Sequence, residues 1–184
     1  WGTDDTALIR ALATRNKRSL ARVNVGYRQK HGEPLQQLVD AELGGSSKNQ
    51  WYLYLAKFLV VQEEQADAMI LDLAMESPEG VDHAALSEFL CARHPKRVRA
   101  AKIRWEQSHD DSLVDKLADH LGGDMQKLAL RLLKGKRDTD AGGDDDVDEG
   151  LARKQAHQLK DGLADFIEVL CDNSPKQNLA VAKV

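Results

Sequence analysis

The feature that most constrains this chain is an internal repeat. When the sequence is shifted by 78 positions, the first 45 residues meet matching glycine, acidic, arginine and leucine positions of a second copy without a gap. The matched pairs include Gly2/Gly80, Asp4/Asp82, Leu12/Leu90, Arg15/Arg93, Leu35/Leu113, Leu43/Leu121, Gly44/Gly122 and Gly45/Gly123. A repeat of this length indicates one supersecondary unit used more than once, with neighbouring units burying each other's apolar faces.

The clearest element of the repeat is an amphipathic helix that begins after Pro34 and ends at a pair of glycines. Leu35, Leu38 and Val39 recur at i, i+3 and i+4, which places them on one face of a helix. Proline is tolerated at a helix start because its missing N–H would be unpaired there. Glycine after the last apolar position is a typical stop signal.

Glu42 lies in the last turn of this helix, and it is the one residue there with unusual chemistry. The helix dipole is negative at that end, so a carboxylate is unfavourable unless a cation offsets it. The second copy has His120 at this position, and a histidine suits a helix C-terminus. Two interpretations stay open: Glu42 is a surface acid that points into solvent, or it is a cation ligand.

Composition narrows the class of protein. The chain of 184 residues has a net charge of -4, which argues against general nucleic-acid affinity. It has no apolar run of the roughly 18 residues that suggest a membrane span, and no signal-peptide pattern. It opens with Trp1 rather than Met, so we expect the natural N-terminus to be missing. Cys91 and Cys171 lie among apolar neighbours and are predicted to be reduced, as in cytosolic proteins.

The remaining sequence predicts one helix after another, and no alternating strand pattern occurs. The first helix is expected to follow an N-cap at Thr3 or Asp4, the second to begin at Ser19 and the third to begin after Pro34. A last helix is expected to run from Ser174 to the end of the chain. The helices expected between them cover residues 50–61, 63–75, 82–92, 95–107, 110–121, 124–134, 147–159 and 164–172. We therefore predict an all-α fold.

Residues 135–149 differ in character from the rest of the chain. They contain seven acids and three glycines without apolar periodicity, which predicts an exposed acidic connector. The spacing of Asp138, Asp140 and Asp144 does not match the alternate ligand positions of an EF-hand loop. We therefore reject an EF-hand.

Taken together, these residues resemble the annexin repeat. The resemblance rests on Gly2-Thr3-Asp4 before the first helix, Leu12 and Arg15 at its end, Tyr27, and Leu35 and Val39 followed by an acid forty positions after the glycine. The acidic connector resembles the long link between the second and third annexin repeats, so the resemblance covers nearly the whole chain. It implies repeats of five helices each, wound into a right-handed superhelix, that dock on anionic phospholipid in the presence of calcium.

The resemblance also implies a division of the chain. Residues 1–75 would form a first repeat with one candidate calcium site, and residues 76–134 a second repeat whose calcium site is degenerate. The acidic connector over 135–149 and the start of a third repeat over 150–184 would follow. The family usually carries four repeats.

The calcium site implied for the first repeat consists of Gly2, Thr3 and Glu42. Calcium takes about six to eight oxygen ligands, so loop carbonyls, a bidentate Glu42, water and lipid phosphate would share its coordination shell. Trp1, at the tip of the loop, is a candidate membrane contact because indole favours the membrane–water interface. The family's loop begins three residues before Trp1, so at least one carbonyl ligand is absent.

The other copies depart from this pattern. In the second copy Val81 replaces the threonine and His120 replaces the acid. In the third copy Lys160 and Asp161 occupy the Gly-Thr positions, and Asn173 replaces the arginine. We therefore expect no calcium site of this type in either copy.

Other candidate sites are weaker. Cys91–Trp105 is rich in arginine and lysine and forms a solvated face, a lipid-headgroup patch or an RNA patch. The histidines lack zinc-site spacing, and neither a nucleophile–base arrangement nor paired carboxylates stand out, so we expect no enzyme.

Two functional hypotheses follow. The first is a cytoplasmic, peripheral membrane protein that binds Ca²⁺ and anionic phospholipid. The second is a divergent annexin-fold scaffold that acts through protein or cytoskeletal contacts with little dependence on calcium.

Overall fold

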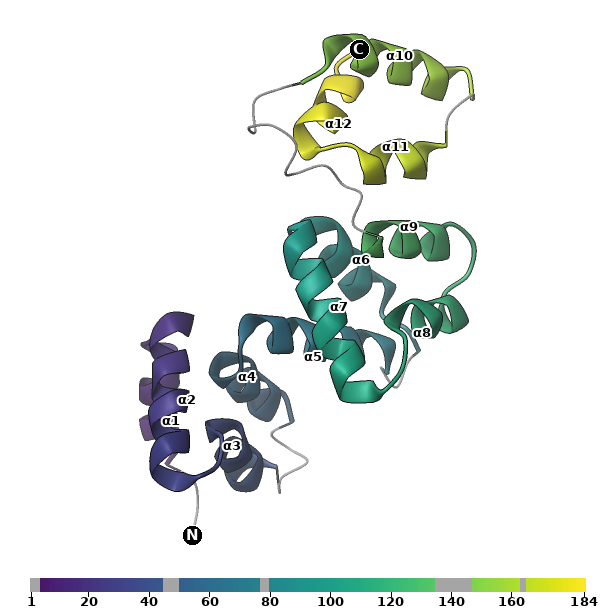
Figure 1. The fold of residues 1–184 in the computed structure, drawn as a ribbon. Helices are drawn as coiled ribbons and strands as arrows, with labels where there is room; N and C mark the ends of the chain where they lie inside the picture. Colours follow the sequence, from purple (N-terminus) through teal and green to yellow (C-terminus); the bar gives the residue numbers. More distant parts are fainter. Residues whose placement is uncertain (1–3, 45–49, 77–79, 135–146, 163–164) are drawn as a thin grey trace. The chain divides into compact units, whose positions relative to one another are not determined.

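The computed structural model describes residues 4–44, 50–76, 80–134, 147–162 and 165–184. Over these residues it contains twelve α-helices and no strand (Figure 1), so the predicted all-α fold is confirmed. The chain divides into two compact units, Trp1–Met69 and Ile70–Val184.

The first unit is built around one central helix. It contains α1 (Asp5–Ala13), α2 (Lys17–His31), α3 (Leu35–Leu43), α4 (Gln50–Val60) and the start of α5 (Glu63–Met75). Helix α4 contacts α1, α2 and α3 (Figure 1). The apolar core of the unit comprises Leu12, Leu20, Val39, Leu43, Ala56, Val60, Val61 and Ala66. The apolar face predicted for α3 packs on the core at Leu35 and Val39, but the prediction was wrong at Leu38, which is 38% exposed.

Two polar side chains of α2 fix the ends of neighbouring helices. The ammonium of Lys17 donates to the carbonyls of Phe58 and Val61, the latter at 2.9 Å. These carbonyls lie at the C-terminal end of α4, where the helix dipole favours a cation. The side-chain oxygen of Asn24 accepts a hydrogen bond from the N–H of Leu35 at 2.9 Å, which ties α2 to the start of α3.

The second unit repeats this plan and extends it. It contains the rest of α5, then α6 (His83–Ala92), α7 (Pro95–His109), α8 (Leu113–His120), α9 (Gly123–Leu133), α10 (Glu149–Lys160), α11 (Phe166–Asp172) and α12 (Pro175–Ala182). Helix α9 contacts α6, α7 and α8, as α4 contacts α1, α2 and α3. Helix α11 contacts α9, and α10 contacts α12.

The 78-residue repeat extends to individual hydrogen bonds. Asp4 caps α1 by accepting from the N–H of Ala7 at 3.0 Å, and Asp82 caps α6 by accepting from the N–H of Ala85 at 2.9 Å. An aspartate at this position satisfies a backbone N–H that would otherwise lack a partner. The paired aspartates of the two copies therefore have the same structural role.

The helix predicted over residues 110–121 was wrong at its start. Helix α8 begins at Leu113, because Ser112 caps it by accepting from the N–H of Asp115 at 3.3 Å. Asp110 instead ends α7 in the left-handed conformation, with φ 50°. Three consecutive capping residues offered three possible helix starts, and the last is used.

Two predictions about organisation stay predictions. The acidic connector lies outside the described residues except for 147–149. The right-handed superhelix also stays an expectation.

Candidate functional site

Glu42 lies where the sequence places it, in the last turn of α3. Its neighbour Leu43 and the preceding Val39 are buried in the core of the first unit, whereas Glu42 is exposed. The last turn of α3 contains no basic residue. Nearby, Asp40 pairs with Lys57 of α4 at 2.9 Å. The end of α3 thus presents an exposed carboxylate at the negative end of a helix dipole.

The equivalent helix of the second copy has the same shape and different chemistry. Leu117 and Leu121 are buried, like Val39 and Leu43, and His120 is exposed, like Glu42. The Nδ1 atom of His120 lies 2.8 Å from the carbonyl of Lys116. Calcium prefers oxygen ligands, so an imidazole at this position does not fit a calcium site.

The remaining residues of the predicted calcium site are Gly2 and Thr3. They and Trp1 lie outside the described residues. Among the residues that the structure does describe, no group of three or more His, Cys, Asp or Glu side chains is arranged to hold a metal ion. Glu42 supplies at most two of the oxygens that calcium takes, so backbone carbonyls and water would have to supply the rest.

A second cluster of polar side chains joins α5 to α7 in the second unit, and sequence reasoning missed it. The carboxylate oxygen Oδ1 of Asp72 accepts a hydrogen bond from the indole N–H of Trp105 at 2.5 Å and lies 3.2 Å from Nε2 of His109. The rings of Trp105 and His109 stack, with centroids 4.1 Å apart and planes 8° from parallel. The i, i+4 spacing of Trp105 and His109 in the sequence predicts that their rings meet on one helix face. No sequence signal identifies Asp72 as their partner.

The surroundings of Asp72 act on its protonation in both directions. Burial raises the pKa of Asp72 above its usual range, and the negative charge of Glu76 adds to this effect. The hydrogen bond from Trp105 and the charges of His109 and Lys116 lower the pKa of the same carboxyl, but burial dominates. Asp72 is thus an acid whose charged form is disfavoured by the fold.

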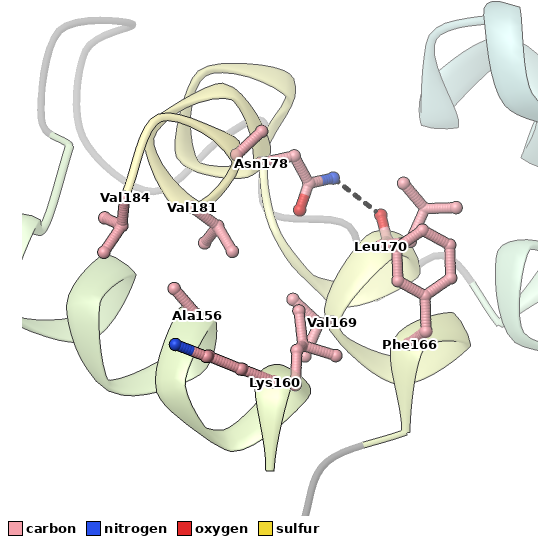
Figure 2. Close-up of a pocket in the computed structure, with 10 residues that line it drawn as sticks. Ala156, Lys160, Phe166, Val169, Leu170, Asn178, Val181 and Val184 are labelled. Atoms are coloured by element: carbon pink, nitrogen blue, oxygen red, sulfur yellow. Dashed lines mark hydrogen bonds between the residues drawn. The ribbon is translucent and has the colours of Figure 1, made fainter. Parts of the chain in front are cut away.

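Figure 2 shows an apolar cavity of about 460 Å³ between α10, α11 and α12. Phe166, Val169 and Leu170 of α11 line it, and the amide of Asn178 donates to the carbonyl of Leu170 at 2.9 Å. When Arg93 of the second copy is aligned with Asn173 of the third, these three residues correspond to Leu86, Phe89 and Leu90 of α6. Those three side chains are buried, and α6 contacts α9. The cavity therefore marks core-forming positions rather than a set of convergent polar groups.

A second groove of about 670 Å³ lies between α10 and α12. Arg153 and His157 of α10 line it together with Lys176 and Lys183, and Glu149 contributes one acid. On α7, the basic stretch interpreted as a solvated face, a lipid-headgroup patch or an RNA patch has Lys96 and Arg99 exposed, while Val98 and Ala101 are buried. The alternatives for that basic stretch stay open.

Fold and site together define a class of protein. Over the described residues it is an all-helical repeat protein, in which the last turn of equivalent helices carries an exposed acid in one copy and an exposed histidine in the other. Comparison with known proteins identifies the family. The annexin family model matches residues 1–50. Annexin A13 of Mus musculus is 31% identical over 185 residues, covering 96% of this chain and 55% of that protein. Annexin A5 of Macaca fascicularis is 28% identical over 158 residues, covering 86% and 46% respectively.

Solved structures agree with the sequence comparison. The structure of annexin III matches with a TM-score of 0.84 and 26% identity, covering 98% of this chain and 55% of that one. The chain belongs to the annexin family. It spans about half the length of the curated relatives it matches. Annexins generally bind phospholipid membranes peripherally and in a calcium-dependent manner, and the family is generally non-enzymatic.

Proposed function

We propose that this chain binds anionic phospholipid surfaces in a calcium-dependent manner, through a single calcium site in the first copy. The observation that carries the proposal is the exposed carboxylate of Glu42 at the C-terminal end of α3, in a last turn without a basic residue. Glu42 would bind the ion with two oxygens, and backbone carbonyls near Gly2 and Thr3 would complete the protein's share. A bound calcium ion would supply charge that bridges these oxygens and lipid phosphates.

The second copy would not contribute a calcium site of this kind. His120 stands at the position of Glu42 and offers nitrogen rather than oxygen to a cation. This chain would therefore bind membranes more weakly than an annexin with an acid at this position in both copies. Of the helices described, none has both the length and the apolar character needed to cross a bilayer. Because annexins generally bind membranes peripherally, we propose that this chain binds the membrane surface from the cytoplasm.

Cosedimentation with vesicles tests this function. Vesicles of phosphatidylserine and phosphatidylcholine should pellet the chain in calcium but not in chelator, and vesicles of phosphatidylcholine alone should pellet little of it. Glu42→Gln removes one charge and one good oxygen ligand, so it should abolish most of the calcium-dependent pelleting. His120→Gln is the matched control on the equivalent helix and should leave pelleting unchanged.

A calorimetric titration of calcium into the same variants separates ion binding from lipid binding. The unsubstituted chain and His120→Gln should give the same calcium affinity, and Glu42→Gln should lose it. If Glu42→Gln binds calcium as the unsubstituted chain does, Glu42 is an ordinary surface acid.

The alternative function is a divergent annexin-fold scaffold that acts through protein or cytoskeletal contacts. Two observations favour it: His120 in place of an acid, and the absence of a three-residue metal cluster among the described side chains. A scaffold would pellet with cytoskeletal filaments equally in calcium and in chelator, and vesicle binding would not respond to either Glu42→Gln or calcium.

A further inference from the structure

The Asp72–His109 pair has a geometry that requires an extra proton. Nδ1 of His109 lies 2.9 Å from the backbone carbonyl of Trp105. A carbonyl oxygen can only accept a hydrogen bond, so Nδ1 must carry a hydrogen. In the neutral imidazole the other nitrogen, Nε2, then has a lone pair and no hydrogen.

Nε2 of His109 faces Oδ1 of Asp72 at 3.2 Å. If Asp72 is ionised and His109 is neutral, two lone pairs oppose each other across this contact. A proton between the two atoms converts the repulsion into a hydrogen bond, either as imidazolium with carboxylate or as imidazole with carboxylic acid. We propose that Asp72 and His109 form a proton-binding site that fastens the C-terminal end of α7 to α5.

The neighbours of the pair favour holding this proton. Trp105 fixes both partners, because its N–H donates to Oδ1 of Asp72 and its ring stacks on His109. Glu76, directly after α5, adds negative charge beside Asp72, and Asp110 follows His109 along the chain. Lys116 on α8 acts in the opposite direction. Both side chains of the pair are about one-third exposed, so the proton can exchange with solvent.

The proton links the stability of the α5–α7 contact to pH. The folded pair binds a proton that the separated groups of the unfolded chain release at lower pH, so its contribution is present in acid. The contribution is lost as the pH rises through the titration of the pair, and the two lone pairs then repel. The α5–α7 contact is therefore stronger in mild acid than above neutral pH.

The first copy contains a natural control. Tyr27 and His31 occupy the positions of Trp105 and His109 on α2, and their rings also stack, with centroids 4.4 Å apart and planes 26° from parallel. Within the part of the chain that the structure describes, His31 makes no ion pair of the kind that joins His109 to Asp72. A substitution of His31 is therefore the matched control for a substitution of His109.

The fluorescence of Trp105 tests the proposal. In a chain with Trp1→Phe and Trp51→Phe, Trp105 is the remaining indole, and a protonated imidazole stacked on it quenches its emission. Emission should rise in one step as the pH increases from about 5 to about 8. His109→Gln should abolish the step, His31→Gln should leave it unchanged, and Asp72→Asn should shift it to lower pH because the proton loses its anionic partner.

Histidine nitrogen chemical shifts provide a second measurement that needs no substitution at the pair. In the ¹⁵N-histidine-labelled chain, neutral His109 should carry its hydrogen on Nδ1, because that nitrogen donates to the carbonyl of Trp105. The proposal is overturned if deprotonated His109 carries its hydrogen on Nε2, or if Asp72→Asn, folded by circular dichroism, leaves the fluorescence step at the same pH.

Discussion

Arg131 of α9 and Asp172 of α11 form a bidentate ion pair in the second unit. Nε and Nη2 of the guanidinium donate to the two carboxylate oxygens at 2.9 and 2.6 Å, and Nη1 donates to Glu168 at 2.7 Å. These hydrogen bonds and charges raise the pKa of Arg131 above its usual range. The fork geometry of the guanidinium suits two parallel bonds to a carboxylate, which a lysine cannot reproduce.

Arg131→Lys should therefore destabilise the second unit although it keeps the charge. The side chain of Asp172 is 38% exposed, so we expect a modest cost of about 1 kcal/mol rather than the value of a buried pair. Denaturant unfolding measures this difference. Lys127→Ala, which removes a pair at 3.4 Å between largely exposed side chains on the same helix α9, is the control and should change stability by much less. Equal effects of the two substitutions would contradict the prediction.

Lys17 is predicted to matter to the first unit in a way that an exposed lysine does not. Its ammonium bonds the carbonyls of Phe58 and Val61 at the end of α4. Lys17→Met keeps the stem but leaves these carbonyls without that donor, so it should lower the free energy of unfolding by about 1–2 kcal/mol. Lys30→Met, an exposed position near the end of α2, is the control. If thermal unfolding shifts equally in both variants, Lys17 does not stabilise the end of α4.

The sequence predicted the helices well because helix signals are local. The 78-residue repeat and the capping residues required only neighbours along the chain, and Asp4 and Asp82 cap α1 and α6 in the same way. The position of Glu42 on an exposed last turn was also predictable, since Val39 and Leu43 must face the core. The Asp72–Trp105 contact was not predictable, because it joins residues 33 positions apart through packing.

The boundaries of the second and third repeats, 76–134 and 150–184, stay predictions. The order of the helices favours an end of the second repeat that lies after residue 134. Helix α5 follows α4 in the first copy, and α10 is the helix that follows α9 in the second. Asp72 of α5 accepts a hydrogen bond from Trp105 of α7, so α5 contacts the second helix after it. Helix α10 also contacts the second helix after it, α12. We therefore propose that α10 closes the second copy and that α11 opens the third.

Trp1 is predicted to enter the membrane interface when calcium and anionic vesicles are both present. Trp51 is 80% exposed and Trp105 is buried, so Trp51→Phe removes the competing exposed indole and leaves Trp105 as a constant background. The emission of this variant should shift to the blue and strengthen on vesicles, because indole favours the interface. The double variant with Trp1→Phe provides the background spectrum. An unchanged difference spectrum on vesicles that do bind the chain would remove Trp1 from the contact surface.

Trp105→Phe is predicted to destabilise the second unit by an amount that depends on pH. The substitution removes the indole N–H that donates to Asp72 and lowers the pKa of that carboxyl, so the pKa of Asp72 should rise further. A carboxyl with a raised pKa contributes stability below its ordinary pKa and loses that contribution as the pH rises through its folded-state value. The cost of Trp105→Phe should therefore be largest, about 1–3 kcal/mol, once the pH is high enough to ionise Asp72 and leave its carboxylate short of a donor, and it should be smaller in acid.

Denaturant unfolding of this variant in acid and above neutral pH measures the difference, since the contribution of a carboxyl with a raised pKa falls as the pH rises. Trp51→Phe replaces an exposed indole on α4 and is the matched control. It should cost little at either pH. Trp105 is only 2% exposed, so the smaller ring also leaves unfilled space in the core, and that part of the cost should be the same at both values of pH. A cost of Trp105→Phe that is the same in acid and at neutral pH would mean that the indole stabilises α7 by packing alone and does not act on the carboxyl of Asp72.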